Sequence, residues 1–429
     1  MKEALKAAAS ESVYALFAEP TAAYRGKPFW SWNGKLDKDE ALRQIRILKE
    51  MGFGGFFMHS RTGLATEYLG DDWFELINLC ADEAEQLGME AWLYDEDRWP
   101  SGTAGGLVTQ NPRFRLKFIR LRVVPAAEFR HKGDPIALFA CRLDGLSYRD
   151  LRKLAIAEGD PELAAEESVL VFTIEEQASE SFYNGYTYLD TMNPEAVRRF
   201  LELTHEKYKS NSGSRFGRAI KGIFTDEPHR GALMDGFGLR NEDAHWLAPW
   251  TYALFERFRD KYGYDLVPCL PELFLQPEGR AVSQVKWHYT DLLQDLFLES
   301  FLKPLHEWCI RNGIVLTGHA LHEDSLSAQT AMVGSMMRFY EHMGYPGVDV
   351  LTEGNESYWV VKQLASAARQ LGQTWMMSEL YGCTGWQMTL EGHKAVGDWQ
   401  ALFGINLRCH HLSWYTMEGE AKRDFPASI

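Results

Sequence analysis

The sequence lacks the cysteine patterns that mark disulfide-bonded and zinc-binding proteins. Its six cysteines are widely scattered, and no two of them form a C-x-x-C pair: Cys80, Cys141, Cys269, Cys309, Cys383 and Cys409. This spacing favours reduced thiols over a disulfide framework or a structural zinc site. We therefore expect a protein that resides in a reducing compartment.

Long apolar segments are missing as well. No run of apolar residues approaches the length of a membrane span. The N-terminal sequence, M-K-E-A-L-K-A-A-A-S-E-S, has no continuous apolar region of the kind found in signal peptides. These two absences predict a cytoplasmic protein that does not insert into a membrane.

An excess of positive charge is also absent, because 60 acidic residues outnumber 45 basic ones and give a net charge of -15. This balance argues against nucleic acid or an anionic membrane surface as a partner and is compatible with a neutral substrate. Aromatic residues are abundant by contrast, at 13%, with 14 tryptophans. Flat apolar rings suit sugar binding, although any single aromatic residue is more often part of the core.

Strands and helices are predicted to alternate along most of the chain. Eight short apolar runs read as strands, at residues 28–33, 55–60, 89–94, 220–225, 314–318, 348–352, 374–378 and 406–412. Helical patterns lie between them, at residues 38–51, 72–87, 194–210, 248–262, 282–311, 357–371 and 390–403. Because eight strand–helix units define a (β/α)8 TIM barrel, we predict one over residues 28–429, after a lead-in at residues 1–27.

Two features depart from a regular series of eight units. Residues 112–192 carry strand-like alternation and turn residues, which predicts a β-rich insertion after the third strand. The chain ends at Ile429, soon after the eighth strand, and this leaves little room for an eighth helix. The second feature is what we expect of a truncated chain.

Two glutamates at strand ends are the candidates for catalysis. The active site of such barrels lies at the C-terminal ends of the strands, where Glu227 follows the fourth strand and Glu379 the seventh. Glycosidic bond hydrolysis needs one acid to protonate the leaving oxygen and a second carboxylate to attack the anomeric carbon or activate water. We predict Glu227 as general acid or acid/base, with its pKa raised by Asp226, and Glu379 as nucleophile or base.

The two mechanisms differ in geometry, and the residues leave both open. A separation of about 5 Å between the carboxyl groups favours retention of configuration, and roughly 6.5–9.5 Å favours inversion. The alternative for Glu227 is a helix cap or surface acid, and for Glu379 a structural carboxylate under the rim.

Polar and aromatic residues recur at the other strand ends and are predicted to bind the substrate. These residues are Trp30, Trp32, His59, Arg61, Asp95, Glu96, Asp226, His319, Glu353, Tyr381, His411 and Trp414. Carboxylates suit sugar hydroxyls because each has two acceptor oxygens. Asp95 and Glu96 fit an ion pair with Arg98 or Arg61 equally well, the histidines fit structural roles, and the tryptophans fit core packing.

Two other classes of function compete with this interpretation. A metal-dependent barrel hydrolase would use His59, His319 and carboxylates, but the first strand carries W-S-W-N and has no H-x-H pair. A non-catalytic carbohydrate-binding barrel would use the same rim without turnover. The substrate of the predicted glycosidase is an oligosaccharide or glycoside, and the sugar, its anomeric configuration, its linkage and the oligomeric state are not specified by these patterns.

Several segments together resemble a known family. They are P-F-W-S-W-N-G, G-F-F-M-H-S-R, L-Y-D-E-D-R-W-P-S-G-T-A-G-G, F-T-D-E-P, M-S-E-L-Y-G and the C-terminal G-D-W-Q-A-L-F-G-I-N-L-R-C-H-H-L-S-W-Y-T-M-E-G. The chain resembles bacterial barrel glycosidases related to the α-L-rhamnosidases of glycoside hydrolase family 106 from Pro28 onward, and the D-E-x-x-W-P-S-G-x-A-G-G segment is the most specific part.

This resemblance implies a (β/α)8 catalytic domain with Glu227 in the acid position and Glu379 as the second carboxylate. It also implies inversion of configuration and, in some members, a dependence on calcium, whereas the wider group of barrel glycosidases with acids on strands four and seven retains configuration. The residues themselves predict no resident metal or cofactor. The chain departs from the rhamnosidases because it lacks the large β-sandwich domains that usually accompany the barrel.

Overall fold

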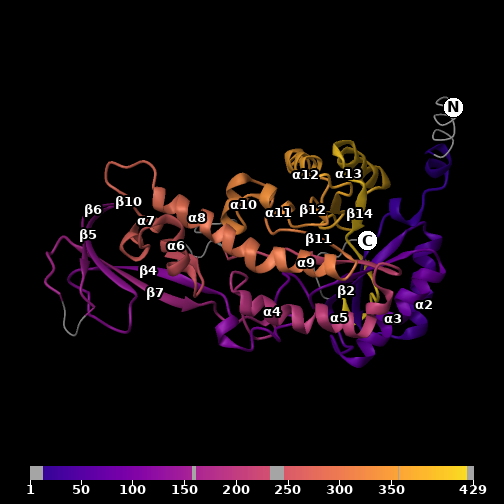
Figure 1. Cartoon of the computed structure of the whole chain (residues 1–429), viewed down its shortest axis with the longest axis horizontal. Helices are drawn as coiled ribbons and strands as arrows, with labels where there is room; N and C mark the ends of the chain where they lie inside the picture. Colours follow the sequence, from indigo (N-terminus) through magenta and orange to yellow (C-terminus); the bar gives the residue numbers. More distant parts are fainter. Residues whose placement is uncertain (1–12, 157–160, 232–245, 356, 423–429) are drawn as a thin grey trace.

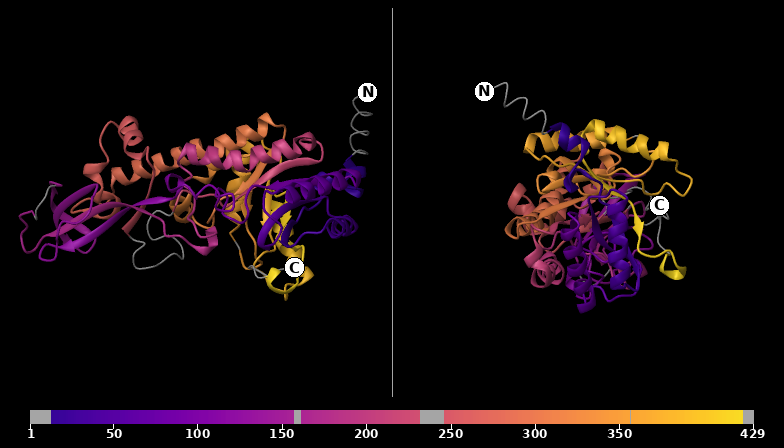
Figure 2. Two further views of the ribbon diagram at one scale, coloured as in Figure 1. Left: turned by 90° about the horizontal axis from the view of Figure 1, so that it is seen from below. Right: turned by 90° about the vertical axis from the view of Figure 1, so that its right-hand side faces the viewer.

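The computed structural model describes residues 13–156, 161–231, 246–355 and 357–422. The first part of the predicted lead-in and the last residues of the chain lie outside these ranges. The structure is elongated, with a barrel at one end and a second sheet at the other (Figures 1 and 2). None of the helices in the described ranges is long and apolar enough to cross a membrane.

The barrel is a nearly closed sheet of parallel strands. Its strands are β14 (Leu407–His410), β13 (Met377–Leu380), β12 (Tyr345–Asp349), β11 (Val315–His319), β8 (Ile220–Asp226), β3 (Glu90–Tyr94), β2 (Gly55–Leu64), β1 (Phe29–Gly34) and β15 (Ser413–Trp414), in this spatial order. β14 and β15 follow one another in the chain but occupy opposite edges of the sheet, so residues 407–414 join the two edges. The Lys27 amide also donates to the Arg408 carbonyl at 2.9 Å. The predicted TIM barrel is confirmed.

Strand positions differ from the prediction in the second half of the barrel. The sixth strand was predicted at 348–352 but lies at Tyr345–Asp349, and the seventh, predicted at 374–378, lies at Met377–Leu380. The predicted eighth strand, 406–412, is β14, with β15 after it. The sixth was misplaced because Val350 and Leu351 are apolar although they follow the strand, and Leu351 lines a cavity at the rim.

Helices cover the outside of the barrel (Figure 1). They are α2 (Lys38–Glu50), α3 (Asp71–Gln86), α4 (Pro194–Leu203), α5 (His205–Ser212), α9 (Lys303–Arg311), α10 (Leu326–Met332), α11 (Met336–Tyr340), α12 (Tyr358–Leu371) and α13 (Leu390–Phe403). The helix predicted at 194–210 is divided at Thr204 into α4 and α5. The predicted cap of α2 is confirmed, because the Asp37 carboxylate accepts from the Glu40 amide at 3.0 Å and satisfies a free helix N–H.

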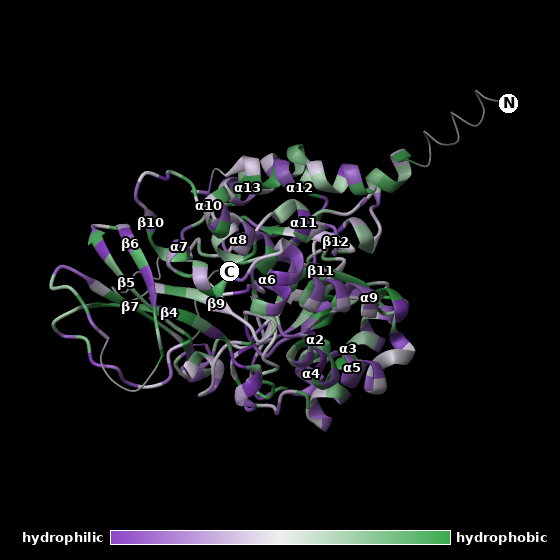
Figure 3. Ribbon diagram, turned by 60° about the vertical axis from the view of Figure 1, so that its left-hand side comes forward, coloured by the Kyte–Doolittle hydropathy of each residue, from purple (hydrophilic) through white to green (hydrophobic). Residues whose placement is uncertain are grey.

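The second sheet is built mainly from the predicted insertion. It orders β10 (Gln276–Pro277), β6 (Ser147–Leu154), β5 (Ala137–Asp144), β7 (Ser168–Glu176), β4 (Lys117–Pro125) and β9 (Leu247–Trp250), and hydrophobic stretches run along its strands (Figure 3, green). β9 and β10 come from outside residues 112–192. The helix predicted at 248–262 was therefore wrong at its start. There β9 pairs with β4, and the helix α6 (Leu254–Tyr262) begins only after it.

One long helical segment connects the two ends of the molecule. The helix α8 (Gln284–Phe297) continues through a π-helical stretch, Leu298–Leu302, into α9. Near its start lies the short α7 (Pro271–Phe274), beside the second sheet (Figure 1). This segment was predicted as a single helix over residues 282–311.

Alternation along the strands sorts side chains between the barrel interior and the helix layer. Phe29, Phe57 and Phe224 are buried together inside the barrel, with ring centroids 4.8 to 5.6 Å apart. Trp30 and Trp32 point the other way, because successive residues of a strand face opposite sides. The aromatic layer inside the barrel forms the floor beneath the strand ends.

Candidate active site

The site lies at the next inward-facing positions along the strands, directly above this aromatic floor. On β2, β8 and β13, the residue two positions beyond a floor residue is ionisable, which places His59 above Phe57, Asp226 above Phe224 and Glu379 above Met377. A strand with period two therefore brings ionisable groups to the same height on several strands. All of these side chains are buried.

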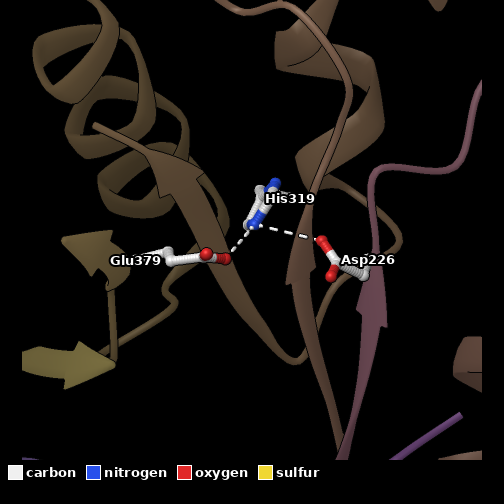
Figure 4. A group of neighbouring side chains, drawn as sticks. All are labelled: Asp226, His319 and Glu379. Atoms are coloured by element: carbon white, nitrogen blue, oxygen red, sulfur yellow. Dashed lines mark hydrogen bonds and ion pairs between the residues drawn. The ribbon is translucent and has the colours of Figure 1, made fainter. Parts of the chain in front are cut away.

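His319, at the end of β11, lies between two carboxylates. Its Nε2 atom is 2.7 Å from Oε2 of Glu379 and 3.4 Å from Oδ1 of Asp226, so the ring bridges β8 and β13 (Figure 4). Burial lowers the pKa of His319, but the hydrogen bond to Glu379 and the surrounding carboxylates outweigh burial and hold the pKa well above its usual value. The imidazole is therefore a cation at neutral pH.

Glu379 keeps its negative charge because the cationic His319 lies beside it. Burial raises the pKa of Glu379, but the hydrogen bond and charge of His319, together with His411 and Arg61, lower it below its usual value. His411 Nε2 lies 3.7 Å from the Glu379 carboxylate. The group is thus an ionised, oriented carboxylate, as a nucleophile or base must be.

Glu227 has the opposite electrostatic environment. Burial, followed by the charge of Asp226, raises the pKa of Glu227 to about 8, so the carboxyl group is protonated at neutral pH. Asp226 is held by the Tyr94 hydroxyl, which donates to Oδ2 at 2.6 Å. The backbone of Glu227 is left-handed, with φ of 47°. This conformation ends the regular alternation of β8 directly after Asp226.

The two glutamates share one cavity. It has a volume of about 190 Å³ and is lined by Arg61, Trp99, Asp226, Glu227, His319, Asp349, Leu351, Glu379, Cys383 and His411. We call it the catalytic cavity. Four of the predicted substrate-binding residues also line it, namely Arg61, Asp226, His319 and His411, and none of the tryptophans named from the sequence does. Trp99 supplies the aromatic wall instead.

Arg61 and Trp99 form one wall of the catalytic cavity. The Arg61 guanidinium lies 4.2 Å from the centroid of the Trp99 ring, at cation–π distance. Arg61 also donates from Nη2 toward His411 Nε2 at 3.4 Å and from Nη1 toward His59 Nε2 at 3.3 Å. His59 does not line the cavity. Its ring stacks on Tyr94 at 3.7 Å, and it supports Arg61 from below.

Glu96 organises the loop that carries Trp99, which is a different use from the predicted binding of sugar hydroxyls. Its carboxylate accepts backbone N–H groups from five loop residues at 2.5 to 2.9 Å: Asp97, Gly102, Thr103, Ala104 and Gly105. The carboxylate is buried, and its hydrogen bonds are made to the loop backbone. The W-P-S-G-T-A-G-G motif thus folds around a side chain that precedes it.

Asp95 is likewise part of the scaffold. The Ser101 hydroxyl donates to Oδ1 of Asp95 at 2.5 Å, while the Ser101 oxygen accepts from the Asp226 amide at 2.8 Å. Ser101 therefore ties the loop to the end of β8, immediately before Glu227. Asp95 is fully buried and does not line the catalytic cavity, which favours a structural role over the predicted contact with substrate.

The three tryptophans predicted to stack on sugar lie elsewhere. Trp30 donates from its indole N–H to Gln44 on α2 at 2.8 Å, and Trp32 packs edge-on against Trp73 on α3 at 5.0 Å. Trp414 is buried in the cluster that includes Phe29. Alternation puts Trp30 and Trp32 outside the barrel, since Phe29 points inside.

Two more predicted residues are displaced from the site. Tyr381 would point inward by alternation from Glu379, but its left-handed backbone, with φ of 76°, turns the ring toward Val396 of α13. Glu353 is exposed, because the sixth strand ends earlier than predicted. Asp349 holds the position at the end of β12 instead. It was missed because the apolar residues after it resemble a continuing strand.

Metal ligation is geometrically possible within the described ranges, at two groups that share His319. The donor atoms of Asp226, His319 and Glu379 lie within 4.8 Å of one another, as do those of Glu227, His319 and Asp349. Calcium takes six to eight oxygen ligands, and the imidazole at the centre of both groups does not suit it. A mixed nitrogen and carboxylate set suits a transition metal better. His59, predicted for a metal site, belongs to neither group.

A barrel with paired carboxylates at its rim is an architecture that glycoside hydrolases use. Residues 178–417, more than half of the chain, match the family model of glycoside hydrolase family 106, described as alpha-L-rhamnosidase. The chain belongs to this family. Both Glu227 and Glu379 lie inside the matched range. The predicted relation to the family 106 rhamnosidases is confirmed.

One solved structure shares the fold at low sequence identity. The rhamnosidase from Novosphingobium sp. PP1Y superposes with a TM-score of 0.65 at 16% identity, over 94% of this chain and 56% of that chain. The glycoside hydrolase domain of PgaB (BpsB) from Bordetella bronchiseptica gives 0.43 at 11% identity, over 90% and 94% of the two chains. The present chain thus spans little more than half the length of the rhamnosidase. A search of curated proteins found no match.

Proposed function

We propose that this protein hydrolyses a glycosidic bond, with Glu227 as general acid and Glu379 as nucleophile or general base. One observation carries the proposal. Glu227 and Glu379 line the same cavity, and their surroundings push their pKa values in opposite directions. A pair of carboxyl groups tuned in this way holds one proton donor and one anion at the same pH.

The chemistry follows from these two states. Glu227 donates its proton to the glycosidic oxygen as the bond to the anomeric carbon breaks. Glu379 either attacks that carbon, which retains configuration after water hydrolyses the intermediate, or removes a proton from an attacking water, which inverts it. His319, Arg61 and His411 keep Glu379 ionised and oriented.

The substrate class that family membership favours is an α-L-rhamnoside. The family is described as alpha-L-rhamnosidase, and the structure from Novosphingobium is titled a rhamnosidase. The cavity is compatible with a polar, uncharged ring, because its walls offer hydrogen-bond donors from Arg61 and the histidines and one aromatic face from Trp99.

The test compares two substrates that differ in whether the leaving group must be protonated. Glu227→Gln should slow cleavage of an α-L-rhamnosyl disaccharide by about 10²–10⁴-fold, the usual contribution of a general acid. It should slow 4-nitrophenyl α-L-rhamnoside much less, because nitrophenolate departs without protonation. Glu379→Gln should abolish cleavage of both. Glu341→Gln, at an exposed position, serves as a control of equal charge change.

Each competing class predicts a different result. Full activity in Glu227→Gln and Glu379→Gln would remove the pair from the mechanism. Activity lost on chelation and restored by one transition-metal ion per chain would favour a metal-dependent hydrolase at His319. Rhamnoside binding without turnover by the unaltered protein would favour a carbohydrate-binding barrel. NMR of the first product anomer formed distinguishes retention from inversion.

A further inference from the structure

A second cavity adjoins the catalytic cavity on the side of Glu227. It has a volume of about 360 Å³ and lies beyond the ends of β11 and β12, lined mainly by residues 320–324 and 349–355. Glu227, Asp349, Leu351 and Cys383 line both cavities, whereas Glu379 lines only the catalytic one. We call this second cavity the outer cavity.

The positions of the two glutamates determine where each half of a bound substrate lies. The nucleophile or base acts at the anomeric carbon, so the sugar ring that is cleaved must lie beside Glu379 in the catalytic cavity. The acid protonates the oxygen that joins this ring to the leaving group. Because Glu227 borders both cavities, the leaving group then extends into the outer cavity.

Glu323 is a buried polar residue in the wall of the outer cavity. The side chain is only 5% exposed, and its Oε2 atom accepts from the Asp349 amide at 2.8 Å. The Ala320 backbone N–H also stabilises the carboxylate, but the Oε1 atom accepts no hydrogen bond of regular geometry among the described residues. A buried carboxylate oxygen left without a donor is costly unless a ligand or water supplies one. A hydroxyl or ammonium group in the outer cavity would meet that need.

Charge makes the outer cavity selective. Four carboxyl groups line it, from Glu227, Glu323, Asp324 and Asp349, and no lysine or arginine is among the lining residues. Glu227 is protonated at neutral pH and burial holds the pKa of Asp349 well above its usual value, so above pH 7 the negative charge comes mainly from Glu323 and Asp324. A carboxylate on the leaving group would face these two acids, whereas an ammonium group would be attracted. The catalytic cavity differs, because Arg61 and the protonated His319 balance its acids.

We propose that the outer cavity is the leaving-group subsite and that Glu323 makes it select neutral or amine-bearing sugars over uronic acids. This assignment rests on the proposed function for its place in the reaction. The charge preference itself is a binding property, which can be measured without turnover.

Binding of three sugars to the full chain tests the charge preference. The probes are methyl glucoside, its 6-amino-6-deoxy analogue and methyl glucuronide, titrated at pH 8 and followed by ligand-observed NMR. At this pH Glu323 is mostly ionised, since burial raises its pKa to about 7. We expect the amino sugar to bind at least about tenfold more tightly than the glucuronide, as one charged hydrogen bond accounts for such a factor.

Two variants test whether Glu323 causes this preference. Glu323→Gln keeps the shape of the side chain and should reduce the preference for the amino sugar about tenfold, whereas Glu341→Gln should leave it unchanged. Equal binding of the three probes, no binding of any, tighter binding of the glucuronide, or a preference that survives in Glu323→Gln would each overturn the assignment.

Kinetics separate this proposal from the proposed function. Glu323→Gln should lower kcat/KM for a rhamnosyl disaccharide about tenfold while changing that for 4-nitrophenyl α-L-rhamnoside by less than about twofold. An equal loss on both substrates would refute the leaving-group assignment. If the unaltered protein cleaves neither rhamnoside, rhamnosidase activity fails, and the binding series still decides whether the outer cavity selects by charge.

Discussion

Replacing Asp226 with asparagine tests whether Glu227 acts as the acid. If Glu227 is the general acid, activity requires its protonated form, so kcat/KM should fall as the pH rises through the pKa of this residue, which burial and the charge of Asp226 raise to about 8. The pKa of Asp226 is raised to about 6, by burial first and then by the charge of Glu379. Near pH 8, where Glu227 titrates, Asp226 is therefore already ionised, and its negative charge helps to raise the pKa of Glu227.

The direction and size of the expected shift follow from the order of these causes. Asp226→Asn removes a negative neighbour, which makes ionisation of Glu227 easier and lowers its pKa. A single like charge at this range accounts for about one pH unit or slightly more. Burial remains the larger cause, so the pKa of Glu227 should stay well above that of a free glutamate. The alkaline limb should then move from about pH 8 to about pH 7.

The assay is the pH dependence of kcat/KM with a rhamnosyl disaccharide. Asp260→Asn is the matched control, because Asp260 is an exposed carboxylate on α6, far from the rim. Its alkaline limb should coincide with that of the unaltered protein. A limb that does not move in Asp226→Asn, or that moves to higher pH, would refute the view that Asp226 holds Glu227 protonated.

Three further predictions concern the rim and its supports. Arg61→Gln removes a positive charge that helps lower the pKa of Glu379, so the acidic limb of kcat/KM should move up by as much as about one pH unit. Glu96→Ala leaves five loop N–H groups without their acceptor and should lower the free energy of unfolding in urea by at least about 3 kcal/mol. Gly318→Ala should destabilise the protein more than Gly263→Ala, which costs about 1–2 kcal/mol for its left-handed backbone alone. A Cβ at Gly318 would overlap the backbone oxygen of Thr225, whereas one at Gly263 meets nothing within 4 Å. Equal losses of unfolding free energy in the two variants would contradict this steric argument.

The D-E-x-x-W-P-S-G-x-A-G-G segment shows how the acidic residues of a motif can shape a cavity that they do not line. Glu96 gathers the loop amides, and Ser101 joins the loop to the end of β8. Trp99, between them, is held against Arg61. The specificity of this motif therefore reflects a loop geometry that sets one wall of the catalytic cavity, and the acidic residues in it are structural.

The sequence alone determined the order of eight of the nine barrel strands and placed Glu227 and Glu379 near the ends of two of them. These patterns are local, since each strand is a short apolar run bounded by a cap or a glycine. It did not determine which way Trp30 and Trp32 face. Strands of a parallel barrel are buried on both sides, so their apolar pattern does not reveal which residues point inside.

Only the tertiary structure decided which ionisable groups share a cavity. Asp349 replaced Glu353 because pairing with the neighbouring strands, and not hydrophobicity, sets where the sixth strand ends. His319 joined Asp226 to Glu379 because closure of the sheet brings β8, β11 and β13 together over one floor. A pKa depends on burial and on charges a few ångströms away. The contrast between a protonated Glu227 and an ionised Glu379 therefore arises only when strands distant in the sequence meet.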